Sequence, residues 1–81
     1  MVRVKSDRER SEVQEIFTLL RNERIEKGLS QQRLAEMAGI SRTGLRHIEG
    51  LEINPTLFSL LKVAHALDLR LANLLRLVER E

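Results

Sequence analysis

Cationic and hydrogen-bonding side chains gather on one face of a short segment near the middle of the chain. Ser41 suits the N-cap of a helix in which Leu45 and Ile48 would point inward. The outward side then carries Arg42, Thr43, Arg46 and His47. Guanidinium, hydroxyl and imidazole groups suit phosphate oxygens and the edges of nucleobases, but most surface arginines are simply solvated. The residue types alone leave both interpretations open.

The basic character is local rather than general. The formal net charge of the chain is only +2, which excludes a polycation that coats nucleic acid indiscriminately. Between Gln31 and His47, however, three arginines stand against the single acid Glu36. The flanking segments alternate in sign, as solvated helix faces do. The sequence therefore allows a basic surface in this segment alone.

Nucleophilic and metal chemistry have weaker support. Ser30 and Ser41 each stand where a helix needs a cap, and the sequence places no histidine partner beside them. His47 and His65 come without cysteine or clustered carboxylates, so they do not make a metal site. His47 could serve as a metal ligand or a pH switch, but its outward placement favours a contact with a base or phosphate over plain solvent exposure. His65 lies at the border of an apolar stripe. We expect no enzyme activity, no metal and no cofactor.

The whole chain is expected to form one small helical domain. Its 81 residues can close only a single core, and scarce Gly, Pro and aromatic residues favour helices over strands. Residues 1–10 are charged and aperiodic, so they form a frayed lead-in or the loose start of the first helix, and the domain is expected over 11–81. No apolar run approaches the roughly 20 residues that span a bilayer, and the absence of cysteine fits a reducing compartment. We expect a cytoplasmic chain without a membrane partner.

Two helices and their stops are predicted in the first half of the chain. The first helix carries apolar residues at the spacing of one helix face: Val13, Ile16, Phe17 and Leu20. Gly28 supplies a left-handed stop. Ser30 is a good N-cap for a second helix, of about two turns, whose inward residues are Leu34, Ala35 and Ala38. Gly39 follows as the turn residue.

Two further helices follow the polar segment. After Pro55, Thr56 suits the N-cap of a fourth helix, and its apolar side carries Leu57, Leu60, Leu61, Ala64 and Leu67. A last helix repeats the spacing with Leu71, Leu74, Leu75 and Val78. Five helices are therefore expected.

The second and third helices meet the requirements of a helix-turn-helix. Two helices that cross steeply over a tight turn need a small residue where they touch and a residue tolerant of positive φ between them. Ala35 and Gly39 sit four apart, as this geometry requires. Leu45 and Ile48 would seat the second of the two helices on the core, which leaves its other face free to enter a major groove.

The segment GLSQQRLAEMAGISRTGLRHIEG, Gly28–Gly50, resembles the lambda-repressor-like helix-turn-helix family, which includes phage repressors and the controller proteins of restriction-modification systems. The resemblance continues through NPTLFSLLKVAHALDL, Asn54–Leu69, which looks like the fourth helix of that family and the start of its fifth. It implies the all-α, five-helix lambda-repressor-like fold and binding to double-stranded DNA.

The resemblance also implies roles for individual residues. The DNA-binding set comprises Gln31, Arg42, Thr43, Arg46, His47 and Asn54. Gln31 would meet a phosphate from the amino end of the second helix, whereas the third-helix residues would face the groove. Arg24 would pair with Glu49 and fix the third helix on the scaffold. Where relatives have a basic residue and then glycine after this glutamate, the chain has Gly50 and Leu51.

The last helix carries more leucine than one buried face needs, because Leu77 points away from the others. We expect part of this surface to meet a second subunit, with the interface formed by Leu71, Leu74, Leu77 and Val78. The alternative is that the stripe only closes the core of the monomer. The function expected is a homodimeric transcriptional regulator that binds a pseudo-palindromic operator. The alternative function is an antitoxin-type module that masks a toxin or another protein partner and binds DNA for autoregulation.

Overall fold

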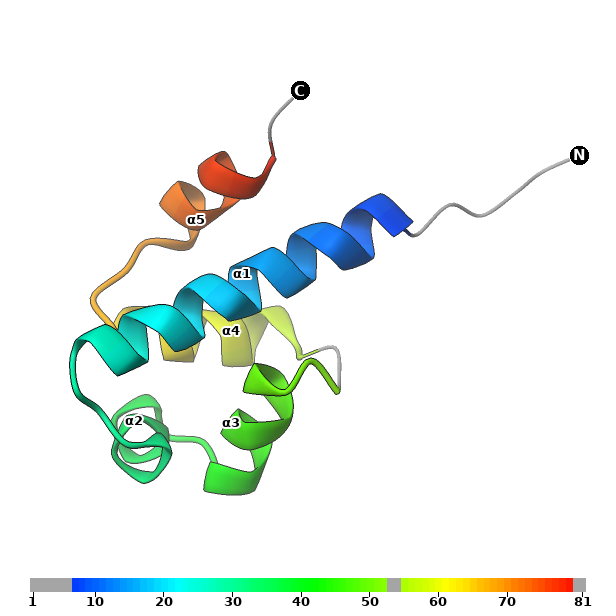
Figure 1. Cartoon of the computed structure of the whole chain (residues 1–81). Coiled ribbons are helices and arrows are strands. Elements are labelled where there is room, and N and C mark those ends of the chain that lie inside the picture. Colours follow the sequence, from blue (N-terminus) through cyan, green and yellow to red (C-terminus); the bar gives the residue numbers. More distant parts are fainter. Residues whose placement is uncertain (1–6, 53–54, 80–81) are drawn as a thin grey trace, which may run out of the picture.

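The computed structural model describes residues 7–52 and 55–79, and all regular structure in these ranges is helical (Figure 1). The helices are α1 (Asp7–Glu26), α2 (Gln31–Ala38), α3 (Arg42–Glu49), α4 (Leu57–Ala66) and α5 (Leu71–Val78). The expected all-α fold of five helices is confirmed. Within the described ranges, no helix has the length and apolarity needed to cross a bilayer.

Three helices begin at the hydroxyl caps that the sequence predicts. Ser30, Ser41 and Thr56 all have extended backbones, and each hydroxyl oxygen accepts a hydrogen bond from the backbone N–H three residues later, at 3.0, 2.9 and 3.1 Å respectively. Each cap satisfies an N–H that has no partner inside its own helix. The starts of α2, α3 and α4 are therefore fixed locally.

A left-handed residue follows each of the first four helices, but it is not always glycine. Gly28 (φ 70°) and Gly39 (φ 71°) adopt the left-handed conformation expected of them. After α3 the left-handed residue is Leu51 (φ 62°), whereas Gly50 has φ −84°. The backbone N–H groups of Leu51 and Glu52 donate to the carbonyls of Ile48 and His47, which closes a Schellman turn. A leucine thus occupies the position that usually takes glycine.

The first helix begins earlier than the start expected for the domain. Asp7 opens α1, so residues 7–10 belong to the loose start of the helix rather than to a lead-in that precedes it. Their side chains are exposed. Asp7 and Glu9 lie in the first turn, where negative charge is favourable beside unpaired backbone N–H groups.

All five helices contribute to one core. The largest fully buried side chains are Phe17, Leu34, Leu45, Leu67 and Val63. In Figure 1, α5 lies on one side of α1 and the α2–α3 pair on the other, and α4 packs against α2. The apolar side expected for the fourth helix is wrong at one position, because Leu57 in its first turn is exposed. Val63 is buried instead, on the helix that packs against α2.

Candidate nucleic-acid interface

The turn between α2 and α3 is held by backbone hydrogen bonds. The N–H groups of Gly39 and Ile40 donate to the carbonyls of Glu36 and Ala35, at 3.2 and 3.0 Å. Ala35 is buried, and the left-handed Gly39 reverses the chain beside it. The two helices therefore cross over a tight turn, as expected for a helix-turn-helix.

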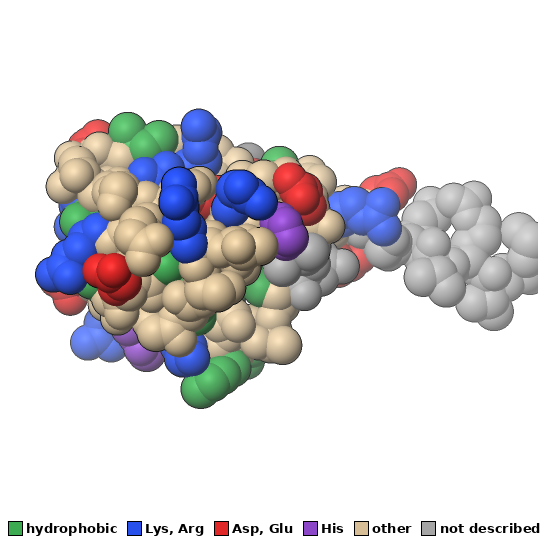
Figure 2. Space-filling view, turned by 90° about the horizontal axis from the view of Figure 1, so that it is seen from below, with side chains coloured by type: hydrophobic (Ala, Val, Ile, Leu, Met, Phe, Trp, Pro, Cys, Tyr) green, Lys and Arg blue, Asp and Glu red, His purple; other side chains and the backbone are tan. Residues whose placement is uncertain are grey.

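The third helix is seated by two residues and open on its other side. Leu45 and Ile48 are buried in the core. Arg42, Thr43 and Arg46 are exposed, and His47 is half-buried. Figure 2 looks onto the α2–α3 side of the molecule and shows lysine and arginine side chains spread over it, with a few acidic side chains among them.

The arginines of this side differ in whether they already have a partner. Arg33 on α2 lies 3.8 Å from Glu36, in an exposed pair. Among the residues that the structure describes, no carboxylate pairs with Arg42 or Arg46. Their guanidinium groups are therefore available to an anionic or hydrogen-bonding ligand. The His47 imidazole is less free, because its Nε2 lies 3.9 Å from Glu52 Oε1.

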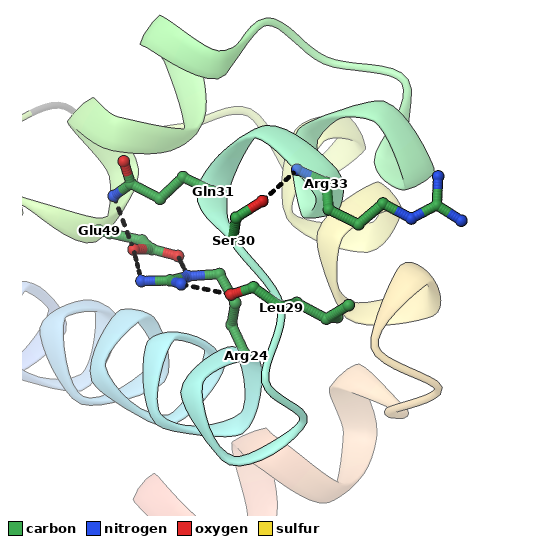
Figure 3. Close-up of polar contacts among 6 residues, drawn as sticks. All are labelled: Arg24, Leu29, Ser30, Gln31, Arg33 and Glu49. Atoms are coloured by element: carbon green, nitrogen blue, oxygen red, sulfur yellow. Dashed lines mark hydrogen bonds and ion pairs between the residues drawn. The ribbon is translucent and has the colours of Figure 1, made fainter.

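A largely buried ion pair joins α3 to the end of α1. Arg24 Nε donates to Glu49 Oε2 at 2.8 Å, and Arg24 Nη2 donates to Glu49 Oε1 at 3.1 Å (Figure 3). Arg24 Nη1 also donates to the carbonyl of Leu29 at 2.6 Å, across the turn that leads to α2. The side chains of Arg24 and Glu49 are only 13% and 4% exposed. This two-point contact fixes the last turn of α3 on the scaffold.

Gln31 is engaged in the same network, which the sequence did not reveal. Its Nε2 donates to Glu49 Oε1 at 3.1 Å (Figure 3). The phosphate contact expected of Gln31 must therefore use the remaining N–H of an amide that is already bound within the protein. The two residues are far apart in sequence, so no spacing rule could have joined them.

A second contact that the sequence did not reveal braces the turn of the helix-turn-helix. Lys62 on α4 donates to the carbonyl of Gly39 at 3.2 Å. Its ammonium also lies 4.6 Å from the centroid of the exposed Phe58 ring. The contact satisfies a carbonyl just beyond α2, and it ties α4 to the segment that sets the angle between α2 and α3.

The residues expected at a subunit interface divide into two groups. Leu74 and Val78 are 5% and 4% exposed, because their side of α5 faces α1 and closes the core of the chain itself. This placement corrects the expectation that they face a second subunit. Leu77 is 60% exposed and Leu71 is half-buried. Asn54, expected to contact DNA, lies outside the described residues.

The described residues offer little to a metal ion. Over 7–52 and 55–79, no three His, Asp or Glu side chains come together in a group that could hold one.

A seated helix with a free polar face, preceded by a braced tight turn, defines a DNA-binding transcription regulator of the helix-turn-helix class. The family model described as Helix-turn-helix matches residues 20–74. The chain belongs to the helix-turn-helix family.

Solved structures narrow the comparison to controller proteins. The restriction-modification controller protein C.AhdI from Aeromonas hydrophila is 34% identical, with a TM-score of 0.72, and the match covers 79% of this chain and 97% of that one. A variant of the restriction-modification controller protein C.Esp1396I has a TM-score of 0.74 at 24% identity, with 83% and 87% of the two chains covered, and it shows the shared fold alone. No curated protein sequence matches the chain.

Proposed function

We propose that the chain is a controller-type transcriptional regulator that binds a pseudo-palindromic operator as a homodimer. Each protomer inserts α3 into a major groove, and two protomers reach successive grooves on one face of the duplex. The observation that carries the proposal is the open face of α3, on which Arg42 and Arg46 have no carboxylate partner among the described residues while Leu45 and Ile48 anchor the opposite face. The similarity to C.AhdI supports the controller-type role.

The residues of the interface have different tasks in this proposal. Arg42 opens α3, and its planar fork suits the O6 and N7 acceptors of guanine. Arg46 and Thr43 contact base edges or phosphates farther along the groove, and His47 adds a contact at the end of the helix. Gln31 is proposed to meet a phosphate of the DNA backbone, and Asn54 is proposed as a further DNA contact.

The dimer is proposed to form through the exposed edge of α5. Leu77 is the most exposed leucine of that helix, and it borders a surface cavity of about 480 Å³. The lining also includes the apolar Leu19, Leu51 and Val78 and the polar Ser11, Gln14, Glu15 and Thr18. An apolar edge beside a partly apolar hollow suits a two-fold interface, because such an interface presents the same patch twice.

Selection of bound duplexes from a random DNA pool by the purified chain tests the proposal. We expect recovery of a motif with two inverted half-sites whose centres lie about one helical turn apart. Recovery of no motif would reject sequence-specific binding. A single asymmetric half-site would reject the homodimer and keep the helix-turn-helix contact.

A further inference from the structure

The Gln31–Glu49 hydrogen bond gives the buried ion pair a part in DNA binding. We propose that Glu49 is a positioning residue, whose carboxylate holds the Gln31 amide in one orientation for its contact with DNA. This inference rests on the proposed function. Glu49 itself is only 4% exposed, so it acts through Gln31 rather than through a contact of its own.

The carboxylate decides which end of the amide faces the protein. An ionised carboxylate only accepts hydrogen bonds, so it selects the amide nitrogen and rejects the amide oxygen. Gln31 Nε2 lies 3.1 Å from Glu49 Oε1, and its Oε1 points away from the carboxylate (Figure 3). Toward a ligand, Gln31 therefore presents its carbonyl oxygen and one remaining N–H in a fixed arrangement.

The position of the carboxylate is itself fixed. Glu49 Oε1 accepts from Arg24 Nη2 as well as from Gln31, and Glu49 Oε2 accepts from Arg24 Nε. Arg24 is held in turn by the carbonyl of Leu29, two residues before Gln31. The hydrogen bonds of Arg24 and Glu49 therefore both reach the entry to α2, one at Leu29 and the other at Gln31. They also shield the carboxylate from water that would compete for the amide.

The functional gain is that the Gln31 side chain is already ordered before DNA binds. Immobilising a free side chain at an interface weakens binding by about two- to tenfold in Kd. Gln31 loses its side-chain conformational entropy on folding rather than on binding DNA. Its neighbour Gln32 provides a matched control, because its Nε2 donates to Glu36 Oε2 at 3.0 Å in an exposed pair where water competes.

The mobility of the side-chain amides in the DNA-free chain gives the first test. Nitrogen relaxation should show Gln31 to be about as rigid as the backbone, with an order parameter near 0.85, and Gln32 to be flexible, below about 0.6. Glu49→Asp keeps a charge opposite Arg24 but withdraws it by one methylene, so it should bring the order parameter of Gln31 down to that of Gln32. Equal mobility of the two amides in the unmutated chain would overturn the proposal, with no variant required.

Operator affinity gives the second test, on a duplex recovered by the selection. Glu49→Asp alone should weaken binding about two- to tenfold, but less than about twofold when Gln31→Ala is already present, because coupled residues are not additive. If Glu49→Asp weakened operator binding by the same factor with and without Gln31→Ala, the role of Glu49 would be purely structural and the proposal would be overturned. The control cycle of Glu36→Asp with Gln32→Ala should be additive. Failure of the selection would count against the proposed function, whereas the relaxation measurement would still decide the orientation of Gln31.

Discussion

Removal of the Glu49 carboxylate should cost a large part of the stability of the fold. Glu49→Ala leaves Arg24 Nε, Arg24 Nη2 and Gln31 Nε2 without their acceptor, and the Arg24 side chain is only 13% exposed. Breaking a buried pair from one side costs about 3–5 kcal/mol. A domain of this size loses about 4–8 °C in Tm for each kcal/mol. The expected fall in Tm is therefore at least about 12 °C.

Thermal and urea unfolding followed by circular dichroism measure this effect against two controls. Glu36→Ala removes one partner of the exposed pair with Arg33 and should cost no more than about 1 kcal/mol. Arg24→Leu combined with Glu49→Leu replaces both charges by apolar side chains and should recover most of the loss, because no charge then stays buried without a partner. If Glu49→Ala unfolds within a few degrees of Glu36→Ala, the buried pair does not hold α3 in place.

The remaining predictions concern the DNA contact, the end of α3 and the dimer. Arg42→Ala should lower discrimination between bases at one position of each half-site by about 1–3 kcal/mol and keep weak non-specific binding. Competition with every single-base variant of the selected duplex measures this discrimination. An equal loss of affinity on all duplexes would make Arg42 a phosphate contact. Leu51→Gly should raise the free energy of unfolding by about 0.5–1 kcal/mol, because φ 62° strains a leucine. A urea midpoint that falls on Leu51→Gly would exclude this account of the turn. Leu77→Glu should give a folded monomer in sedimentation. Leu74→Glu should instead unfold the chain, because it puts a charge into the core. An unchanged sedimentation mass for Leu77→Glu would exclude α5 from the dimer interface.

Much of the fold could be predicted because its decisive signals are local. A hydroxyl cap acts on an N–H three residues away, and a left-handed glycine acts on the turn that contains it, so the sequence itself shows both. The start of α1 could not be located as closely, since the side chains of residues 7–10 are exposed and no periodicity marks them. Leu57 and Leu74 were misassigned for a related reason: spacing identifies an apolar stripe, but the packing of the neighbouring helix decides which of its members are buried.

The candidate site was predictable only in part. The outward face of α3 follows from helical spacing around Leu45 and Ile48, so a single helix suffices to derive it. The hydrogen bonds that join this site to the rest of the fold do not follow from spacing, because their two ends lie on different elements. Gln31 of α2 bonds to Glu49 of α3, and Lys62 of α4 bonds to Gly39 in the turn. Such contacts depend on the crossing of helices, which no local pattern specifies.

The first helix is held at one end only, and this affects how the molecule opens. In α1 the buried side chains are Ile16, Phe17 and Leu20, and the Arg24 guanidinium ties the last turn to α3, whereas the turns before Ser11 are exposed. Amide hydrogens near Asp7 exchange with solvent through fraying that costs little free energy. Those near Leu20 exchange only when the core itself opens. We therefore expect the exchange rates within this one continuous helix to fall from its first turn to its last buried residue, as hydrogen-exchange measurements would check.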